Sequence, residues 1–229
     1  MERSGQSGRD QLAGQLRTTI VPTIGSHMLD IAGILLSRAT EVEYACAMQA
    51  CLPRIDEELG VHDALARTVP PSYDEYRHFF NRVLTPGIPG SLPPVESLFE
   101  DWGGHRAGLQ HGQGFYLGRS AQHVQEVCDS LEIEVPEAYK AVPDHLLLLL
   151  ELNEFLCDHA PADQAHLFAE EHFGWLSDYL DALGARMENE DDEALASAAS
   201  FYCNFVDLVR RVVLDEWGEN DVREVAQSA

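Results

Sequence analysis

The sequence predicts an all-α protein, and three observations carry this prediction. Apolar residues recur at three- to four-residue spacing along most of the chain, as on the buried face of a helix. Strand-like alternation is nowhere convincing, and the segment LEIEVP at 131–136 is too short and isolated to found a sheet. Prolines and small polar residues stand at plausible helix starts. We therefore expect a single all-helical domain over residues 10–229, preceded by a polar, flexible tail at 1–9.

The first half of the chain is predicted to hold three helices before a connector. Apolar spacing favours a helix over 28–52, and the next, over about 53–67, has proline in its first turn, where the missing N–H costs nothing. Ser72 is placed to cap a third helix, whose apolar face includes Phe80. The stretch TPGIPGSLPP at 85–94 holds four prolines and two glycines, so we expect it to be non-helical.

The second half is predicted to hold four more helices after a glycine- and histidine-rich loop at 103–118. Their expected ranges are 119–131, 143–159, 162–184 and 191–217. The second of these begins with Pro143-Asp144-His145 and runs directly into five leucines. It is apolar on most sides, which predicts a helix at the centre of the domain.

Two stretches place an acid at a predicted helix start. Pro143 suits the first helical position, and Asp144 faces the positive end of the helix dipole. A helix start does not account for His145. In SLPPVESLFEDW, residues 91–102, two prolines hold the chain extended and Glu96 then falls in the first turn of a short helix. Both acids are explained as caps, and both also stand where a ligand or peptide meets a helix N-terminus.

The charge balance and the cysteines limit the partners and the compartment. Acids outnumber bases by 39 to 15, a net charge of −24, which disfavours nucleic acid and favours a basic partner; solubility or a salt-adapted host are the alternatives. The five cysteines include no C-x-x-C pair and are expected to be buried free thiols. The leucine run is far shorter than the roughly 20 residues of a membrane span, and the N-terminus lacks an apolar signal sequence, so we expect a cytoplasmic protein without stable membrane insertion.

The alternative reading is a helical metal-binding redox protein of the di-iron carboxylate type. Such a site needs two Glu-x-x-His motifs on facing helices, and only one is present, from Glu75 to His78. His105 and His111 lie six residues apart in the predicted loop and define no site. The chain has neither G-x-S-x-G nor a phosphate-binding G-x-x-x-x-G-K motif. We therefore expect no bound metal, no cofactor and no turnover.

Four stretches in order resemble the TorD/DmsD/NarJ family of cytoplasmic chaperones that mature molybdenum-cofactor oxidoreductases. They are the aromatic-rich helix at 76–80, the Pro-Pro-Val-Glu-Ser turn at 93–97, the Pro-Asp-His-Leu start at 143–146, and the helix with His172 and Trp175. The resemblance covers 73–215 and implies a helical bundle of about nine to eleven helices with no catalytic centre. Two departures are plain: Val95 stands where many members have an aromatic residue, and Cys128 where a tyrosine is common.

The resemblance also implies the partner. Family members bind the twin-arginine signal peptide, or the body, of a molybdopterin-dependent oxidoreductase subunit and hold the apo form until its cofactor is inserted before export; they occur as monomers or domain-swapped homodimers. Carboxylates suit the two guanidinium groups of such a leader, and apolar side chains suit the segment that follows. The implied peptide-binding residues are Pro94, Glu96, Ser97, Phe99, Trp102, Asp144 and His145, supported by Phe80, Pro93, Pro143, His172 and Trp175.

Overall fold

The computed structural model describes residues 25–55, 59, 65, 68–99, 116–188 and 190–214. Within these residues the chain is helical and forms no strand; one isolated antiparallel bridge pairs Val95 with His145. The all-α prediction is therefore confirmed for this part of the chain. The number of helices, expected to be nine to eleven, stays a prediction, as does the single domain over 10–229.

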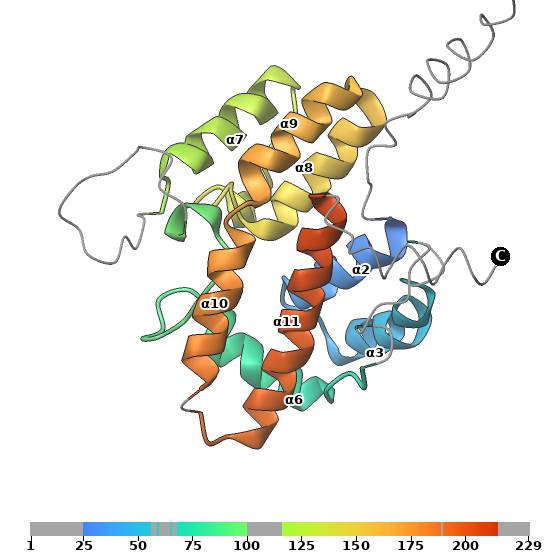
Figure 1. Ribbon diagram of the computed structural model, residues 1–229, viewed down its shortest axis with the longest axis vertical. Helices are drawn as coiled ribbons and strands as arrows, with labels where there is room; N and C mark the ends of the chain where they lie inside the picture. Colours follow the sequence, from blue (N-terminus) through green and yellow to red (C-terminus); the bar gives the residue numbers. More distant parts are fainter. Residues whose placement is uncertain are drawn as a thin grey trace, which may run out of the picture.

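The helices follow one another along the chain in the order of Figure 1. They are α2 (Ser26–Leu35), α3 (Glu41–Ala50), the 3-10 turn η1 (Leu52–Arg54), α6 (Tyr73–Phe79), the π-helical turn η2 (Phe80–Leu84), the 3-10 turn η3 (Glu96–Leu98), α7 (Arg119–Ser130), the 3-10 turn η4 (Glu137–Tyr139), α8 (Leu146–His159), α9 (Ala162–Phe173), α10 (Leu176–Met187) and α11 (Glu193–Val213). Helices α7, α8 and α9 gather at one end of the molecule, and α6 lies at the other, beside α11 (Figure 1).

Capping decides where the predicted 28–52 helix divides. That prediction is wrong, because α2 ends at Leu35 and α3 begins at Glu41. The Thr40 hydroxyl accepts the Glu43 N–H, and the Glu43 carboxylate accepts the Thr40 N–H, so a new helix starts here. The equivalent box between Ser72 and Glu75 starts α6, as expected.

The predicted 162–184 helix is also two helices. The break falls at Gly174-Trp175, between α9 and α10. Glycine is a poor helix former, and the Trp175 indole N–H donates to the carbonyl of His172 at 2.9 Å as the ring enters the core. Predicted helix 143–159 begins three residues late, at Leu146, with His145 as its N-cap.

Some of the remaining sequence predictions can be checked in the structure, and others fall outside the described residues. Segment 85–94 forms no helix, as predicted. Pro53 lies in the turn η1, and most of the predicted 53–67 helix, like most of the 103–118 loop, lies outside the described residues. Of the cysteines, Cys128 is buried, but Cys46 is exposed, so the expectation of five buried thiols is wrong.

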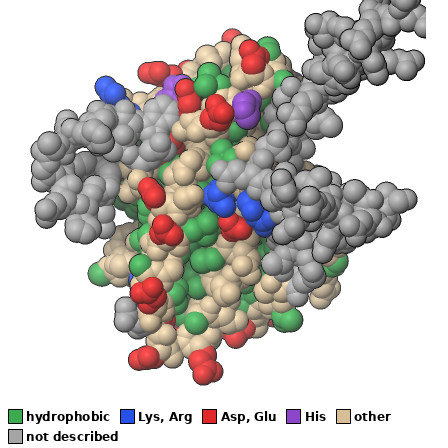
Figure 2. Space-filling view, viewed as in Figure 1, with side chains coloured by type: hydrophobic (Ala, Val, Ile, Leu, Met, Phe, Trp, Pro, Cys, Tyr) green, Lys and Arg blue, Asp and Glu red, His purple; other side chains and the backbone are tan. Residues whose placement is uncertain are grey.

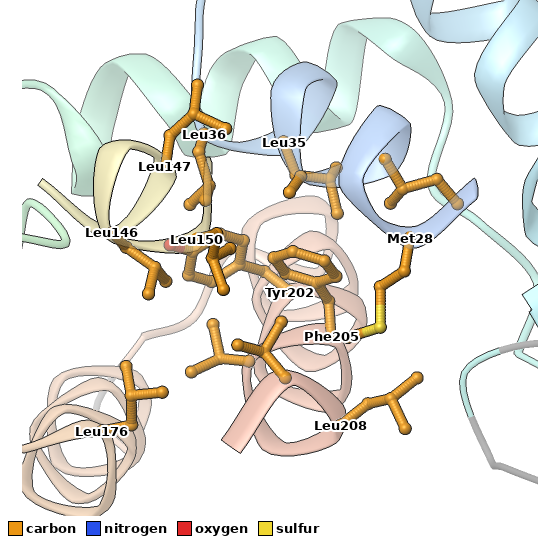
Figure 3. Packing of buried hydrophobic residues seen from close by; sticks show 14 of the residues in the cluster. Met28, Leu35, Leu36, Leu146, Leu147, Leu150, Leu176, Tyr202, Phe205 and Leu208 are labelled. Atoms are coloured by element: carbon orange, nitrogen blue, oxygen red, sulfur yellow. The ribbon is translucent and has the colours of Figure 1, made fainter. Parts of the chain in front are cut away.

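The core cluster includes buried residues of α8, α2 and α11. All five leucines from Leu146 to Leu150 are buried, with at most 7% of any residue exposed. Figure 3 shows Leu146 and Leu150 beside Tyr202 of α11, with Leu35 of α2 close by. Helix α11 itself runs through the molecule with one face buried along its length, against α10, α6 and α9. No helix among the described residues is long and apolar enough to cross a bilayer.

Truncation of a central leucine tests this packing. Leu149 is fully buried, so Leu149→Ala should lower the free energy of unfolding by about 2 to 5 kcal/mol, since it removes apolar contacts and leaves a cavity. Leu167 on α9 is 53% exposed, and Leu167→Ala should change it by less than about 1 kcal/mol. Urea unfolding followed by circular dichroism measures both. Equal effects of the two variants would mean that α8 is peripheral.

Candidate functional site

Two of the stretches singled out in the sequence lie against each other in the structure, although Glu96 and Asp144 within them are 48 residues apart. We call residues 93–97 and 143–146 together the motif junction. The Glu96 N–H donates to the Asp144 carbonyl at 3.1 Å, and the Leu146 N–H donates to the Pro94 carbonyl at 2.9 Å. These two bonds flank the antiparallel bridge between Val95 and His145. The extended proline-rich stretch thereby fixes the chain at the start of α8.

The carboxylate of Asp144 ties three segments together. It is fully buried, and its Oδ2 atom accepts the Ser97 N–H at 2.7 Å and the Ser120 hydroxyl at 3.2 Å. The sequence suggested that Asp144 caps its own helix, α8, but it does not. It binds the first turn of η3 and the first turn of α7 instead. Among the described residues, its Oδ1 atom and the Ser97 hydroxyl have no hydrogen-bond partner.

Glu96 is also fully buried, and its side chain points to α9 rather than to a helix start. Its Oε2 atom lies 2.8 Å from Nδ1 of His172, which is fully buried as well. The other ring nitrogen of His172, Nε2, lies 2.9 Å from Nδ1 of His123 on α7, and the two rings meet edge to edge with their planes 9° apart. A chain of three ionisable side chains thus runs from the motif junction toward the half-buried His123.

His145 is the N-cap of α8, which accounts for its presence before the leucine run. Its Nδ1 atom accepts the Leu147 N–H at 3.2 Å, and the Tyr139 ring lies 5.2 Å away. Burial lowers the pKa of His145 to about 4, because the charged imidazolium is poorly solvated there. The ring is therefore neutral at pH 7 and keeps the lone pair that the cap requires.

Aromatic side chains back the junction. Phe99 stacks on Trp175 at 5.6 Å and meets the edge of Tyr179 at 5.0 Å. The Tyr179 hydroxyl donates to the carbonyl of Leu92, directly before the two prolines. Pro93, Pro94 and Pro143 are buried as well.

Of the predicted residues, one does not join this assembly. Phe80 lies in η2 against Tyr76, in a different pocket, of about 160 Å³, beside Ser37. Trp102 lies outside the described residues. The peptide-binding role expected for the other residues stays a prediction, but neither Glu96 nor Asp144 presents its carboxylate at the surface.

An open pocket of about 440 Å³ lies beside the junction. Its lining is Leu117, Ala121, Gln122, Gln125, Glu126, Lys140 and Pro143. Leu117 is 54% exposed and has a φ of 63°, in the left-handed region that a leucine rarely adopts. An exposed apolar side chain held in a strained backbone makes Leu117 a candidate for a functional position.

Ser120, His123 and the pocket residues of α7 were not predicted from the sequence. No local pattern connects His123 with His172, because the two lie 49 residues apart on different helices. The single Glu-x-x-His motif, in contrast, is used structurally. Glu75 completes the α6 capping box, and His78 lies 3.1 Å from Asp192, the N-cap of α11. The di-iron alternative therefore loses the motif on which it rested.

The half-buried His145 cap of α8 should make the free energy of unfolding depend on pH. The folded-state pKa of His145 is about 4 and the unfolded value is about 6.5. The contribution of neutral His145 to the free energy of unfolding is therefore complete above pH 6.5 and is lost as the pH falls toward 4. Between pH 7 and pH 5 the free energy of unfolding of the wild-type protein should fall by roughly 2 kcal/mol more than that of the His145→Asn variant. Asparagine keeps a capping oxygen but does not titrate. Urea unfolding at both pH values measures this difference, and equal losses would contradict it.

Comparison with known families assigns the chain independently of this geometry. Residues 45–191, well over half of the chain, match the family described as the nitrate reductase delta subunit, and this range includes the whole motif junction together with α7, α8 and α9. No curated protein and no solved structure matches the chain. The chain therefore belongs to the nitrate reductase delta subunit family, a family of chaperones that mature molybdoenzymes.

Proposed function

We propose that this chaperone binds the twin-arginine leader, or the body, of the apo form of a molybdopterin-dependent oxidoreductase subunit and holds it in the cytoplasm until the cofactor is inserted. The observation that carries the proposal is the motif junction, where two separated stretches are joined beside an open pocket. Family membership supports the kind of client. The proposal includes no catalytic step and leaves open whether the chaperone acts as a monomer or as a domain-swapped dimer.

In this proposal Glu96 and Asp144 position the binding surface and do not pair with the arginines. Both carboxylates are fully buried and engaged with groups of the protein itself. An arginine that reached them would have to break these contacts, and breaking a buried charge-assisted hydrogen bond costs about 1.5 to 3 kcal/mol. Their burial favours a structural role, which fixes Pro143 and α7 on either side of the pocket.

Contact with the leader is assigned to the pocket beside the junction. Leu117, Ala121 and Pro143 supply apolar surface for the segment that follows the arginines. Glu126 supplies an exposed carboxylate at the lining, and the single positive charge there, on Lys140, is paired with Glu137 at 2.6 Å. An apolar floor with an acid at its edge matches the chemistry of a basic residue next to a hydrophobic stretch.

The wider surface favours a basic ligand as well. Figure 2 shows acidic side chains over the helices at the upper end and along the left edge of the visible face, with few basic side chains among them. The net charge of −24 attracts a basic leader over a range of about 8 Å at physiological salt. This long-range attraction speeds association, whereas the pocket supplies specificity.

Leader binding is tested with a fluorescent peptide in which two arginines precede an apolar segment. Leu117→Ser should weaken its binding about tenfold or more, since an apolar side chain contributes about 1.5 to 3 kcal/mol when it becomes buried. Leu167→Ser is the matched control, because Leu167 is 53% exposed but lies on α9 outside the pocket. Fluorescence anisotropy gives the affinities. Equal losses in the two variants would remove the pocket from the proposal.

Matched charge variants in the same assay separate local contact from the overall field. Glu126→Gln should weaken binding by up to about fivefold, whereas Glu134→Gln, the same change of charge at an exposed site outside the pocket, should leave it almost unchanged. A peptide with both arginines replaced by lysine should bind less well, because lysine cannot make a bidentate contact.

The buried acids have their own test. The double variant Glu96→Gln with Asp144→Asn should melt at a lower temperature, because charge-assisted contacts worth about 1.5 to 3 kcal/mol each are weakened. Its leader affinity per folded molecule should stay within about threefold of the wild type at a temperature where both are folded. A tenfold loss of affinity with an unchanged melting temperature would show instead that the acids contact the leader.

A further inference from the structure

Three possible metal ligands meet where α7 packs near α9. His123 on α7 and the adjacent Glu171 and His172 on α9 each offer one ligand atom, and these atoms lie within 4.8 Å of one another. They are two imidazole nitrogens and one carboxylate oxygen, the donor set of many zinc sites with three protein ligands. His172 is buried, His123 is half-buried and Glu171 is exposed, so an ion can reach the three side chains from solvent.

Glu96 supplies the outer contact that such a site requires. Histidine ligands usually donate their second ring N–H to a carboxylate, which fixes the ring and makes the metal-facing nitrogen more basic. Glu96 Oε2 lies 2.8 Å from Nδ1 of His172, on the side of the ring opposite to His123. With Glu96 ionised, the ring proton of His172 lies on Nδ1, and the lone pair of Nε2 points toward His123.

We propose that His123, Glu171 and His172 form a binding site for a divalent first-row transition metal ion, with Zn²⁺ as the preferred ion. The ligand atoms are Nδ1 of His123, Nε2 of His172 and a carboxylate oxygen of Glu171. Imidazole nitrogens favour zinc and its neighbours over Mg²⁺ and Ca²⁺, which prefer oxygen ligands. The fourth position is open to water or to a ligand from a partner.

Metal binding requires the two histidine rings to separate and to turn, so that both lone pairs point at the ion. With ligand distances of about 2.0 to 2.2 Å, a tetrahedral ion holds its ligand atoms about 3.3 to 3.6 Å apart. The two ring nitrogens now lie 2.9 Å apart and share a hydrogen bond, so they would separate by roughly half an ångström, and the His123 proton would move to its Nε2 atom. Exposed Glu171 is able to change rotamer toward the ion.

This site differs from the di-iron centre weighed in the sequence analysis, and it reverses the expectation of no metal. It holds one ion, its ligands are mainly nitrogens, and it uses neither Glu75 nor His78. It also stands apart from the proposed leader pocket, since none of its three ligands lines that pocket. Failure of one proposal therefore leaves the other intact.

Zinc titration of the full-length chain tests the site. His105→Ala with His111→Ala serves as the background, which removes the two histidines of the stretch predicted to be a loop. In this background, competition of the protein with a chromophoric zinc indicator at pH 7.5 should show one Zn²⁺ per chain. His123→Ala and Glu171→Gln should each weaken binding about tenfold or more, because each removes a ligand. Glu171→Gln is isosteric and exposed, so it leaves the fold intact.

Matched controls lie on the same helix. His166 and Glu170 form an exposed pair on α9, with Nε2 and Oε1 3.2 Å apart, and His166→Ala or Glu170→Gln should leave zinc affinity unchanged. Glu96→Gln, which alters only the outer contact, should weaken affinity about 10- to 100-fold. Absence of stoichiometric zinc in the background protein, or equal losses in the α9 controls and the ligand variants, would overturn the proposal.

The absorption spectrum of the Co²⁺-loaded protein provides a second readout. A four-coordinate site with two nitrogen ligands should give visible bands that Glu171→Gln shifts and His123→Ala abolishes. A spectrum of six-coordinate aqueous Co²⁺ in the background protein would contradict the site even if zinc bound elsewhere on the acidic surface.

Discussion

The hydrogen bond from the Ser97 backbone to the buried Asp144 carboxylate is the contact on which the rest of this structure depends. A carboxylate without exposure to water is costly unless donors surround it, so its presence requires the Ser97 N–H and the Ser120 hydroxyl to stay in place. Those donors belong to η3 and α7, while the acid belongs to the start of α8. One side chain thus fixes the relative positions of three segments that are remote in sequence.

Removal of Asp144 or of the turn that holds Ser97 would therefore disturb more than one hydrogen bond. Loss of the acid would leave the Ser97 N–H buried without an acceptor, and loss of the turn would leave a buried charge without donors. The backbone bridge at Val95 and His145 adds directional constraint, because it sets the register of the two stretches. Together these contacts explain why Pro-Pro-Val-Glu-Ser and Pro-Asp-His-Leu occur in one chain.

The sequence was sufficient to predict the helical class, the cap at Ser72 and the range of α7. The sequence-based prediction failed where the same apolar spacing fits either one continuous helix or two helices. Apolar spacing continues across residues 36–40 and across Gly174-Trp175, and only a capping box and the burial of Trp175 show that the helices end there. The partners of Glu96 and Asp144 could not be predicted, because capping is a local rule and both carboxylates bind distant segments.

The single lysine of the chain acquires a practical meaning from its position. Lys140 is half-exposed and lines the open pocket, while every other basic side chain is an arginine or a histidine. Amine-reactive reagents therefore have one side-chain target in the entire protein, apart from the terminal amine. A dye or cross-linker attached there reports directly from the edge of the pocket to which client binding is proposed, so the chain carries a natural labelling position for testing that proposal.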